Sequence, residues 1–129
     1  MIRLIFCIRR NPQLTQEQFL THWQGTHAAL VKRHADTLGI REYHQLPAIE
    51  QKITHAIQQQ SGSLPAFDGI AIISFEDMQG FSLPQRDEQA QQAQSEIDDD
   101  CALFIDLQAS SLMLAQSDTV IEAPPQVYG

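Results

Sequence analysis

Residues 67–75 place apolar side chains on both faces of a predicted strand, and this constrains the fold more than any other feature. Successive side chains of a strand point to opposite faces of its sheet. Ile70 and Ile72 therefore point one way, and the other face carries Phe67, Ala71, Ile73 and Phe75. Both faces of the sheet need a cover, because a large exposed apolar surface favours association with another surface.

The remaining elements follow from hydrophobic periodicity and from turn signals. Strands are expected at residues 2–9, 40–46, 67–75 and 106–116, and helices at 15–38, 48–59 and 85–100, with a short helix after 77. Low-complexity sequence is the alternative for the glutamine-rich segment 85–100. The order β-α-β-(α)-β-α-β predicts an α+β fold of ferredoxin-like type, with helices on one face of a four-stranded antiparallel sheet.

The start of the first helix is the clearest local signal in the chain. Thr15 and Gln18 form a capping box, and Leu14 with Phe19 forms a hydrophobic staple. Gly25 lies inside this helix and is expected to bend or interrupt it.

The chain has 129 residues, which suits one domain. We assign residues 1–122 to that domain, with a helical insert at 48–66, and treat 123–129 as a C-terminal tail. The predicted helices cover only one face of the sheet. We therefore expect a second copy of the chain to cover the other face, giving a homodimer through the sheet faces.

Composition excludes several classes of function. Eight Lys and Arg stand against 16 Asp and Glu, a net charge of −8, so we expect no binding to nucleic acid. No apolar run is long enough to span a membrane, and the segment MIRLIFCIRR lacks the order of a signal peptide. Cys7 and Cys101 form no CxxC pair, which favours a reducing compartment. We expect an uncleaved, cytoplasmic protein.

Several segments together resemble the EthD-like family of dimeric α+β barrel proteins. They are LIFCIRRNPQLTQEQF at 4–19, FLTHWQGTHAALV at 19–31, Asp68-Gly69-Ile70-Ala71 with Phe75, Phe104-Ile105-Asp106 and Val120-Ile121-Glu122. The resemblance covers most of residues 2–122. It implies sheet-to-sheet dimers with a small-molecule pocket in each subunit, and relatives that act without metal or organic cofactor. The chain departs from the family pattern at Ile72 and Ser74, where an acidic and an aromatic residue are common.

His27 is the main candidate for chemistry. On a helical wheel it falls within the apolar stripe of Phe19, Trp23, Leu30 and Val31, so it is expected to be buried against the sheet. Burial disfavours the charged imidazole and leaves a neutral ring that can accept a proton. The alternative is a core histidine bound to a carbonyl or carboxylate. The match to the family helix favours the functional role.

A catalytic base needs a partner that orients it or donates a hydrogen bond. We expect Tyr43 to stabilise a developing oxyanion and Asp68 to hold the imidazole tautomer. The alternatives are an aromatic filler for Tyr43 and a turn with Gly69 for Asp68. The expected ligand-binding residues are Phe19, Trp23, Ile72 and Ser74. The chain has no HExxH or CxxC motif, so no metal and no cofactor is expected.

These observations predict a small-molecule pocket protein. One hypothesis is a cofactor-free enzyme, of isomerase, dehydratase or monooxygenase type, acting on a small apolar carbonyl or aromatic compound with His27 as base. The alternative is a non-catalytic binding or accessory protein.

Overall fold

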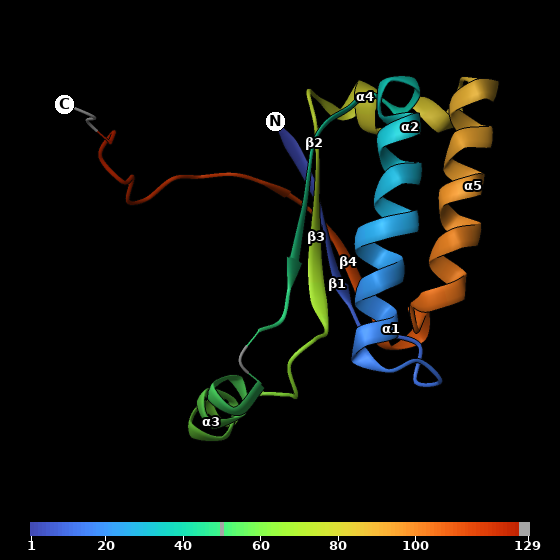
Figure 1. Cartoon of the computed structure of the whole chain (residues 1–129). Coiled ribbons are helices and arrows are strands. Elements are labelled where there is room, and N and C mark those ends of the chain that lie inside the picture. Colours follow the sequence, from blue (N-terminus) through green and yellow to red (C-terminus); the bar gives the residue numbers. More distant parts are fainter. Residues whose placement is uncertain (50, 127–129) are drawn as a thin grey trace.

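The sheet has four antiparallel strands in the order β2-β3-β1-β4, and the long helices cover one of its faces (Figure 1). The computed structural model describes residues 1–49 and 51–126, so residue 50 of the predicted insert and residues 127–129 of the predicted tail lie outside it. The strands are β1 (Ile2–Ile8), β2 (Ile40–Pro47), β3 (Gly69–Phe75) and β4 (Ser111–Gln116). The predicted α+β ferredoxin-like fold is confirmed.

Helical segments connect these strands. They are α1 (Gln16–Thr21), η1 (His22–His27), α2 (Ala28–Leu38), α3 (Gln51–Ser61), α4 (Met78–Phe81), η2 (Leu83–Gln85), α5 (Glu88–Phe104) and η3 (Leu107–Ala109). No helix in the described part of the chain combines the length and apolarity needed to cross a membrane.

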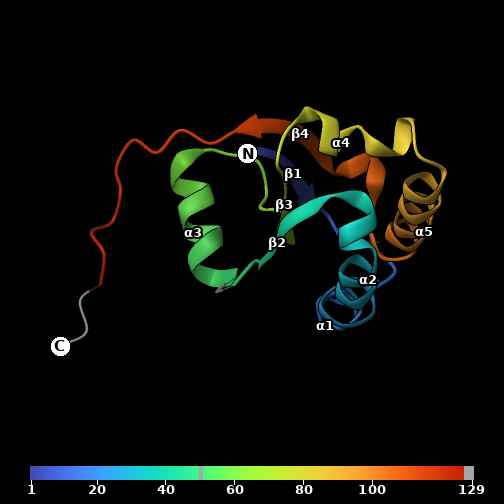
Figure 2. The same ribbon diagram turned by 90° about the horizontal axis from the view of Figure 1, so that it is seen from above.

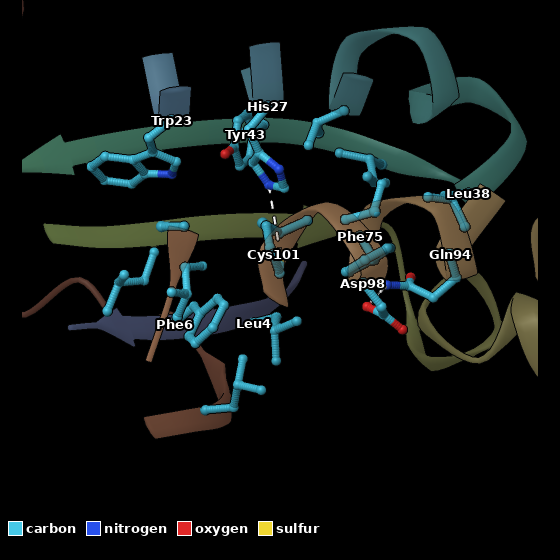
Figure 3. Close-up of a pocket in the computed structure, with 18 residues that line it drawn as sticks. Leu4, Phe6, Trp23, His27, Leu38, Tyr43, Phe75, Gln94, Asp98 and Cys101 are labelled. Atoms are coloured by element: carbon cyan, nitrogen blue, oxygen red, sulfur yellow. Dashed lines mark hydrogen bonds between the residues drawn. The ribbon is translucent and has the colours of Figure 1, made fainter. Parts of the chain in front are cut away.

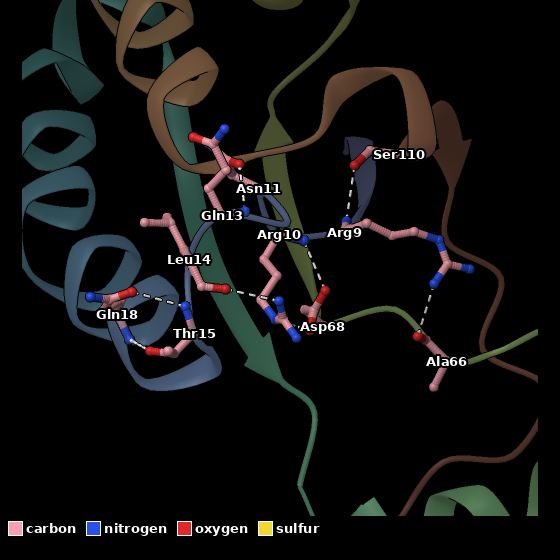
Figure 4. Close-up of polar contacts among 10 residues, drawn as sticks. All are labelled: Arg9, Arg10, Asn11, Gln13, Leu14, Thr15, Gln18, Ala66, Asp68 and Ser110. Atoms are coloured by element: carbon pink, nitrogen blue, oxygen red, sulfur yellow. Dashed lines mark hydrogen bonds and ion pairs between the residues drawn. The ribbon is translucent and has the colours of Figure 1, made fainter.

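The first three helical segments form one continuous helix with a π-helical turn in its middle. The capping box is present at its start, where the Thr15 N–H donates to the Gln18 side chain at 2.9 Å and the Gln18 N–H donates to the Thr15 hydroxyl at 3.1 Å (Figure 4). The interruption expected at Gly25 is the π turn η1. In this turn the Ala28 N–H reaches the carbonyl of Trp23, five residues earlier.

Helix α5 forms where low-complexity sequence was the alternative. The Asp87 carboxylate caps its first turn by accepting the Ala90 N–H at 3.0 Å. Ala90, Ala93 and Ile97 are buried and pack with residues of α2. A thin apolar stripe is therefore sufficient when small alanines allow two helices to approach closely.

Two predicted strands start later than expected. β3 starts at Gly69. In the loop before it, the carbonyls of Pro65 and Ala66 accept hydrogen bonds from the Arg9 guanidinium at 2.8 and 3.1 Å, and Figure 4 shows the contact to Ala66. β4 starts at Ser111, because the residues after α5 form the turn η3, in which the Ser110 hydroxyl donates to the Asp106 carbonyl at 2.7 Å.

The two faces of the sheet differ in their cover. Paired residues share a face, so Tyr43 and Ile73 lie on the face under the helices, whereas Ile5 and Ile72 lie on the open face. α3 and the segment after β4 extend on the open side (Figures 1 and 2). The apolar stripe of α3 is exposed, with Ile53 58% accessible.

Candidate functional site

A cavity of about 170 Å³ lies between the helices and the covered face of the sheet (Figure 3). Most of its lining is aliphatic or aromatic, from all four strands and from the helices above them. Five polar side chains also line it, and they are His27, Tyr43, Gln94, Asp98 and Cys101. The cavity is therefore suited to a small, mainly apolar ligand that makes a few directed polar contacts.

His27 is oriented by a carboxylate from the opposite helix. Its side chain is buried, and its Nδ1 atom lies 2.7 Å from Oδ2 of Asp100 on α5. A carboxylate accepts, so Nδ1 carries the hydrogen and Nε2 carries the lone pair. Nε2 faces the cavity wall, 3.9 Å from Sγ of Cys101 (Figure 3). A carboxylate that holds one ring nitrogen and leaves the lone pair on the other is an arrangement that suits a general base.

The electrostatics keep this imidazole neutral near pH 7. Burial lowers the pKa of His27 below its ordinary value of 6.5, and the hydrogen bond and charge of Asp100 oppose that effect without cancelling it. A neutral imidazole is the form that accepts a proton.

Tyr43 and Cys101 remain protonated in the cavity wall. Burial raises the pKa of Tyr43, whose hydroxyl oxygen accepts a hydrogen bond from Gln45 at 2.9 Å. The tyrosine hydrogen is then available to a ligand oxygen. Burial, together with the charges of Asp98 and Asp100, raises the pKa of Cys101 to about 12. Cys101 is therefore a neutral thiol and a poor nucleophile near neutral pH.

Two of the predicted ligand-binding residues lie at or beside the cavity. Trp23 lines it, and Phe19 packs behind Trp23 with ring centroids 5.3 Å apart. The Trp23 ring lies on the backbone of Gly69, where a Cβ atom would come within 2.6 Å of the ring. Because residue 69 has no side chain, the Trp23 ring can occupy this part of the cavity wall.

The structure does not bring the other two to the cavity. Ile72 and Ser74 lie on the open face of the sheet, where Ser74 is buried and its hydroxyl accepts a hydrogen bond from Arg3 at 3.5 Å. The reason is the alternation of β3, which turns Ala71, Ile73 and Phe75 toward the cavity instead.

Asp68 also lies away from His27. Its carboxylate accepts the Arg10 N–H at 2.8 Å and lies 3.4 Å from Nε of the same arginine (Figure 4). Asp68 thus ties the end of β1 to the start of β3, and the tautomer of His27 is held by Asp100.

Asp100 and His22 are site residues that the sequence reasoning missed. Asp100 follows Ala93 and Ile97 at helical spacing and precedes Phe104, so a carboxylate within an apolar stripe was an available signal. His22 contacts the same carboxylate at 3.0 and 3.1 Å. An α-helix turns about 100° per residue, which separates residues five apart by about 140°. The wider π turn reduces this separation, and His22 and His27 both contact one carboxylate.

Among the described residues, no group of three or more His, Cys, Asp or Glu side chains is arranged to hold a metal ion.

The fold and the site define a small α+β protein with a histidine-centred cavity beneath its helices. The EthD domain family matches residues 11–108, and the chain therefore belongs to this family. The crystal structure of an ethyl tert-butyl ether (EthD) family protein from Bacillus halodurans C-125 has a similar fold, with a TM-score of 0.61 at 16% identity over 92% of this chain and 99% of that chain. No curated protein matches the chain.

Proposed function

We propose that this protein binds a small apolar carbonyl or aromatic compound in its cavity and catalyses a cofactor-free proton transfer on it. The observation that carries the proposal is the 2.7 Å contact between His27 Nδ1 and Asp100 inside an apolar cavity. This contact leaves the Nε2 lone pair of a neutral imidazole on the cavity side.

The chemistry starts with removal of a proton from carbon next to a carbonyl group, or from a phenolic hydroxyl. His27 Nε2 takes this proton, and Asp100 stabilises the imidazolium that forms. Tyr43 donates a hydrogen bond to the enolate or phenolate oxygen. Return of the proton to another carbon completes an isomerisation, whereas its transfer to a departing hydroxyl releases water and completes a dehydration. A monooxygenase-like reaction of a quinol would start with the same deprotonation.

The size of the cavity limits the ligand. Its volume of about 170 Å³ is close to that of an engineered cavity of about 150 Å³ that binds benzene. A compound with about one aromatic ring, or an aliphatic compound of similar size, matches this volume.

The second candidate function is binding without turnover. The apolar lining supports it, since retention of a ligand requires no base. Turnover requires His27 as a base, whereas binding does not. One experiment therefore separates the two functions.

The experiment is native mass spectrometry of ligand retained through purification, with the wild type and with His27→Gln. The matched control is His34→Gln, which removes a different histidine that also contacts α5, through Glu96 and outside the cavity. A catalytic base predicts that wild-type protein converts the identified compound in the absence of added cofactor, and that only His27→Gln abolishes conversion. Simple binding predicts retention of unchanged compound by all three proteins. Absence of any small ligand that fits the cavity would contradict both functions.

We also propose that a second copy of the chain covers the open face of the sheet. Ile5 and Ile72 are paired there, and Met113 of the edge strand β4 is 56% exposed. Helix α3, whose apolar side chains are exposed, lies on the same side of the sheet (Figure 2). The proposal also places the protein in the cytoplasm, which is supported by its two free cysteines.

A further inference from the structure

Two histidines from one helix contact a single carboxylate of another. The side chain of His22 is 27% exposed, that of Asp100 is 12% exposed and that of His27 is 6% exposed. His22 Nε2 lies 3.0 Å from Oδ1 and 3.1 Å from Oδ2 of Asp100, whereas His27 Nδ1 contacts Oδ2 alone at 2.7 Å. The exposure of the three side chains thus decreases from His22 through Asp100 to His27, which lines the cavity.

The contacts of His22 and His27 limit how the Asp100 carboxylate can rotate. A carboxylate held by one hydrogen bond can still turn about its Cβ–Cγ bond, which is a soft torsion. An N–H that is shared between both oxygens restricts this rotation. His22 is placed to restrict it, and Oδ2 then stays directed at Nδ1 of His27.

A neighbouring aromatic ring supports the same arrangement. Phe104 lies one helical turn beyond Asp100, and its ring centroid is 4.8 Å from that of His22 and 4.9 Å from that of His27. Both imidazoles therefore rest on one apolar surface while they share one acceptor. The π turn η1 brings them to the same side of the helix, and π turns are frequent at functional sites.

We propose that His22 is a positioning residue for the base: by holding the Asp100 carboxylate, it keeps His27 in the tautomer whose Nε2 lone pair faces the cavity. The proposal rests on the proposed role of His27 as base, and it adds a residue outside the cavity lining. Among the described residues, the titratable groups that contact His27 or act on it are Asp100 and Cys101 from α5 and His22 from its own helix, and Asp98 of α5 and Tyr43 of β2 line the same cavity.

A purely structural role for His22 predicts something different. As a link between η1 and α5 it would contribute stability, and its loss would lower the melting temperature without changing which ring nitrogen of His27 carries the hydrogen. The tautomer of His27 is therefore the quantity to measure, because a structural link does not control it.

The experiment is ¹⁵N NMR of histidine-labelled protein at pH 7.5, which reports directly which ring nitrogen of His27 carries hydrogen. The variants are His22→Leu, which has no donor, and His22→Gln, whose amide N–H can still donate to the carboxylate. His34→Gln is the matched control, since its partner Glu96 also lies on α5. A second donor-free variant, His22→Ala, replaces His22→Leu if the latter does not fold.

We expect a single Nδ1–H tautomer of His27 in the wild type and in His34→Gln. In the donor-free variant the share of the Nε2–H tautomer rises several-fold, and His22→Gln restores the wild-type share. An unchanged tautomer in a folded donor-free variant would overturn the proposal, and so would a failure of His22→Gln to restore it. This readout needs no ligand. A failure of the proposed function would appear in the ligand experiment, while the tautomer result would stand independently.

Discussion

His27 Nδ1 lies 2.7 Å from the carboxylate of Asp100, which comes 73 residues later in the chain. The contact joins the π turn of the first long helix to the C-terminal half of α5, and it fixes which nitrogen of the base carries the lone pair. Burial of the same imidazole lowers its pKa. A neutral, oriented base in an apolar cavity follows from these two properties together.

The stability of the protein should depend on pH through His27. In the unfolded chain this group titrates near 6.5, and burial lowers the pKa in the folded protein. Between these two values the unfolded state binds more protons, so the stability gained by burying a neutral ring is complete above pH 6.5 and declines as the pH falls through the lower pKa. Urea unfolding from pH 8 to pH 5 measures this decline, and His27→Gln should reduce its slope. An equal dependence of the unfolding free energy on pH in both proteins would show that His27 does not cause the decline.

Removal of the charge on Asp100 should lower the pKa of His27 further. The hydrogen bond and charge of Asp100 raise that pKa against the effect of burial, so Asp100→Asn removes the opposing contribution. The loss of charge-assisted hydrogen bonds should also lower the free energy of unfolding by about 1–3 kcal/mol. NMR titration of His27 and urea unfolding measure the two effects. Asp99→Asn, in the adjacent exposed position, is the control and should change neither.

Gly69 should not tolerate a side chain. A Cβ atom at this position would come within 2.6 Å of the Trp23 ring, which is fully buried. Gly69→Ala should therefore destabilise the protein by about 1–3 kcal/mol, as overpacking does elsewhere, and should displace a wall of the cavity. Gly25→Ala is the matched control, because a Cβ there meets nothing within 4 Å. Thermal unfolding compares the two, and equal melting temperatures would contradict the close packing at Gly69.

A charge on the open face of the sheet should prevent dimerisation. Ile72→Glu places a carboxylate at the centre of the proposed interface, where its desolvation is costly. Sedimentation velocity at micromolar concentration should show a dimer for the wild type and a monomer for this variant. Leu103→Glu is the control, since Leu103 is 64% exposed on α5, on the other side of the sheet. A wild-type monomer would contradict the proposed interface.

Local patterns in the sequence determined most of the fold. Side-chain alternation located the strands, the Thr15 capping box located the start of the first helix, and the apolar stripe of that helix placed His27 under it. These patterns are reliable here because alternation and helical periodicity arise within a few residues of the chain. Alternation also places Ile72 on the opposite face of the sheet from Ala71, away from the cavity, although the family resemblance had suggested Ile72 as pocket lining.

Only the tertiary structure decided which residues surround His27. Asp68 was the nearest carboxylate by the order of elements, yet Arg10 binds it, and Asp100 reaches the imidazole because α5 packs across η1. His22 joins the same carboxylate only because one turn of the helix is π-helical. These contacts depend on how two helices cross and on a local change in helix pitch. Neither property is encoded in the spacing of residues along one element.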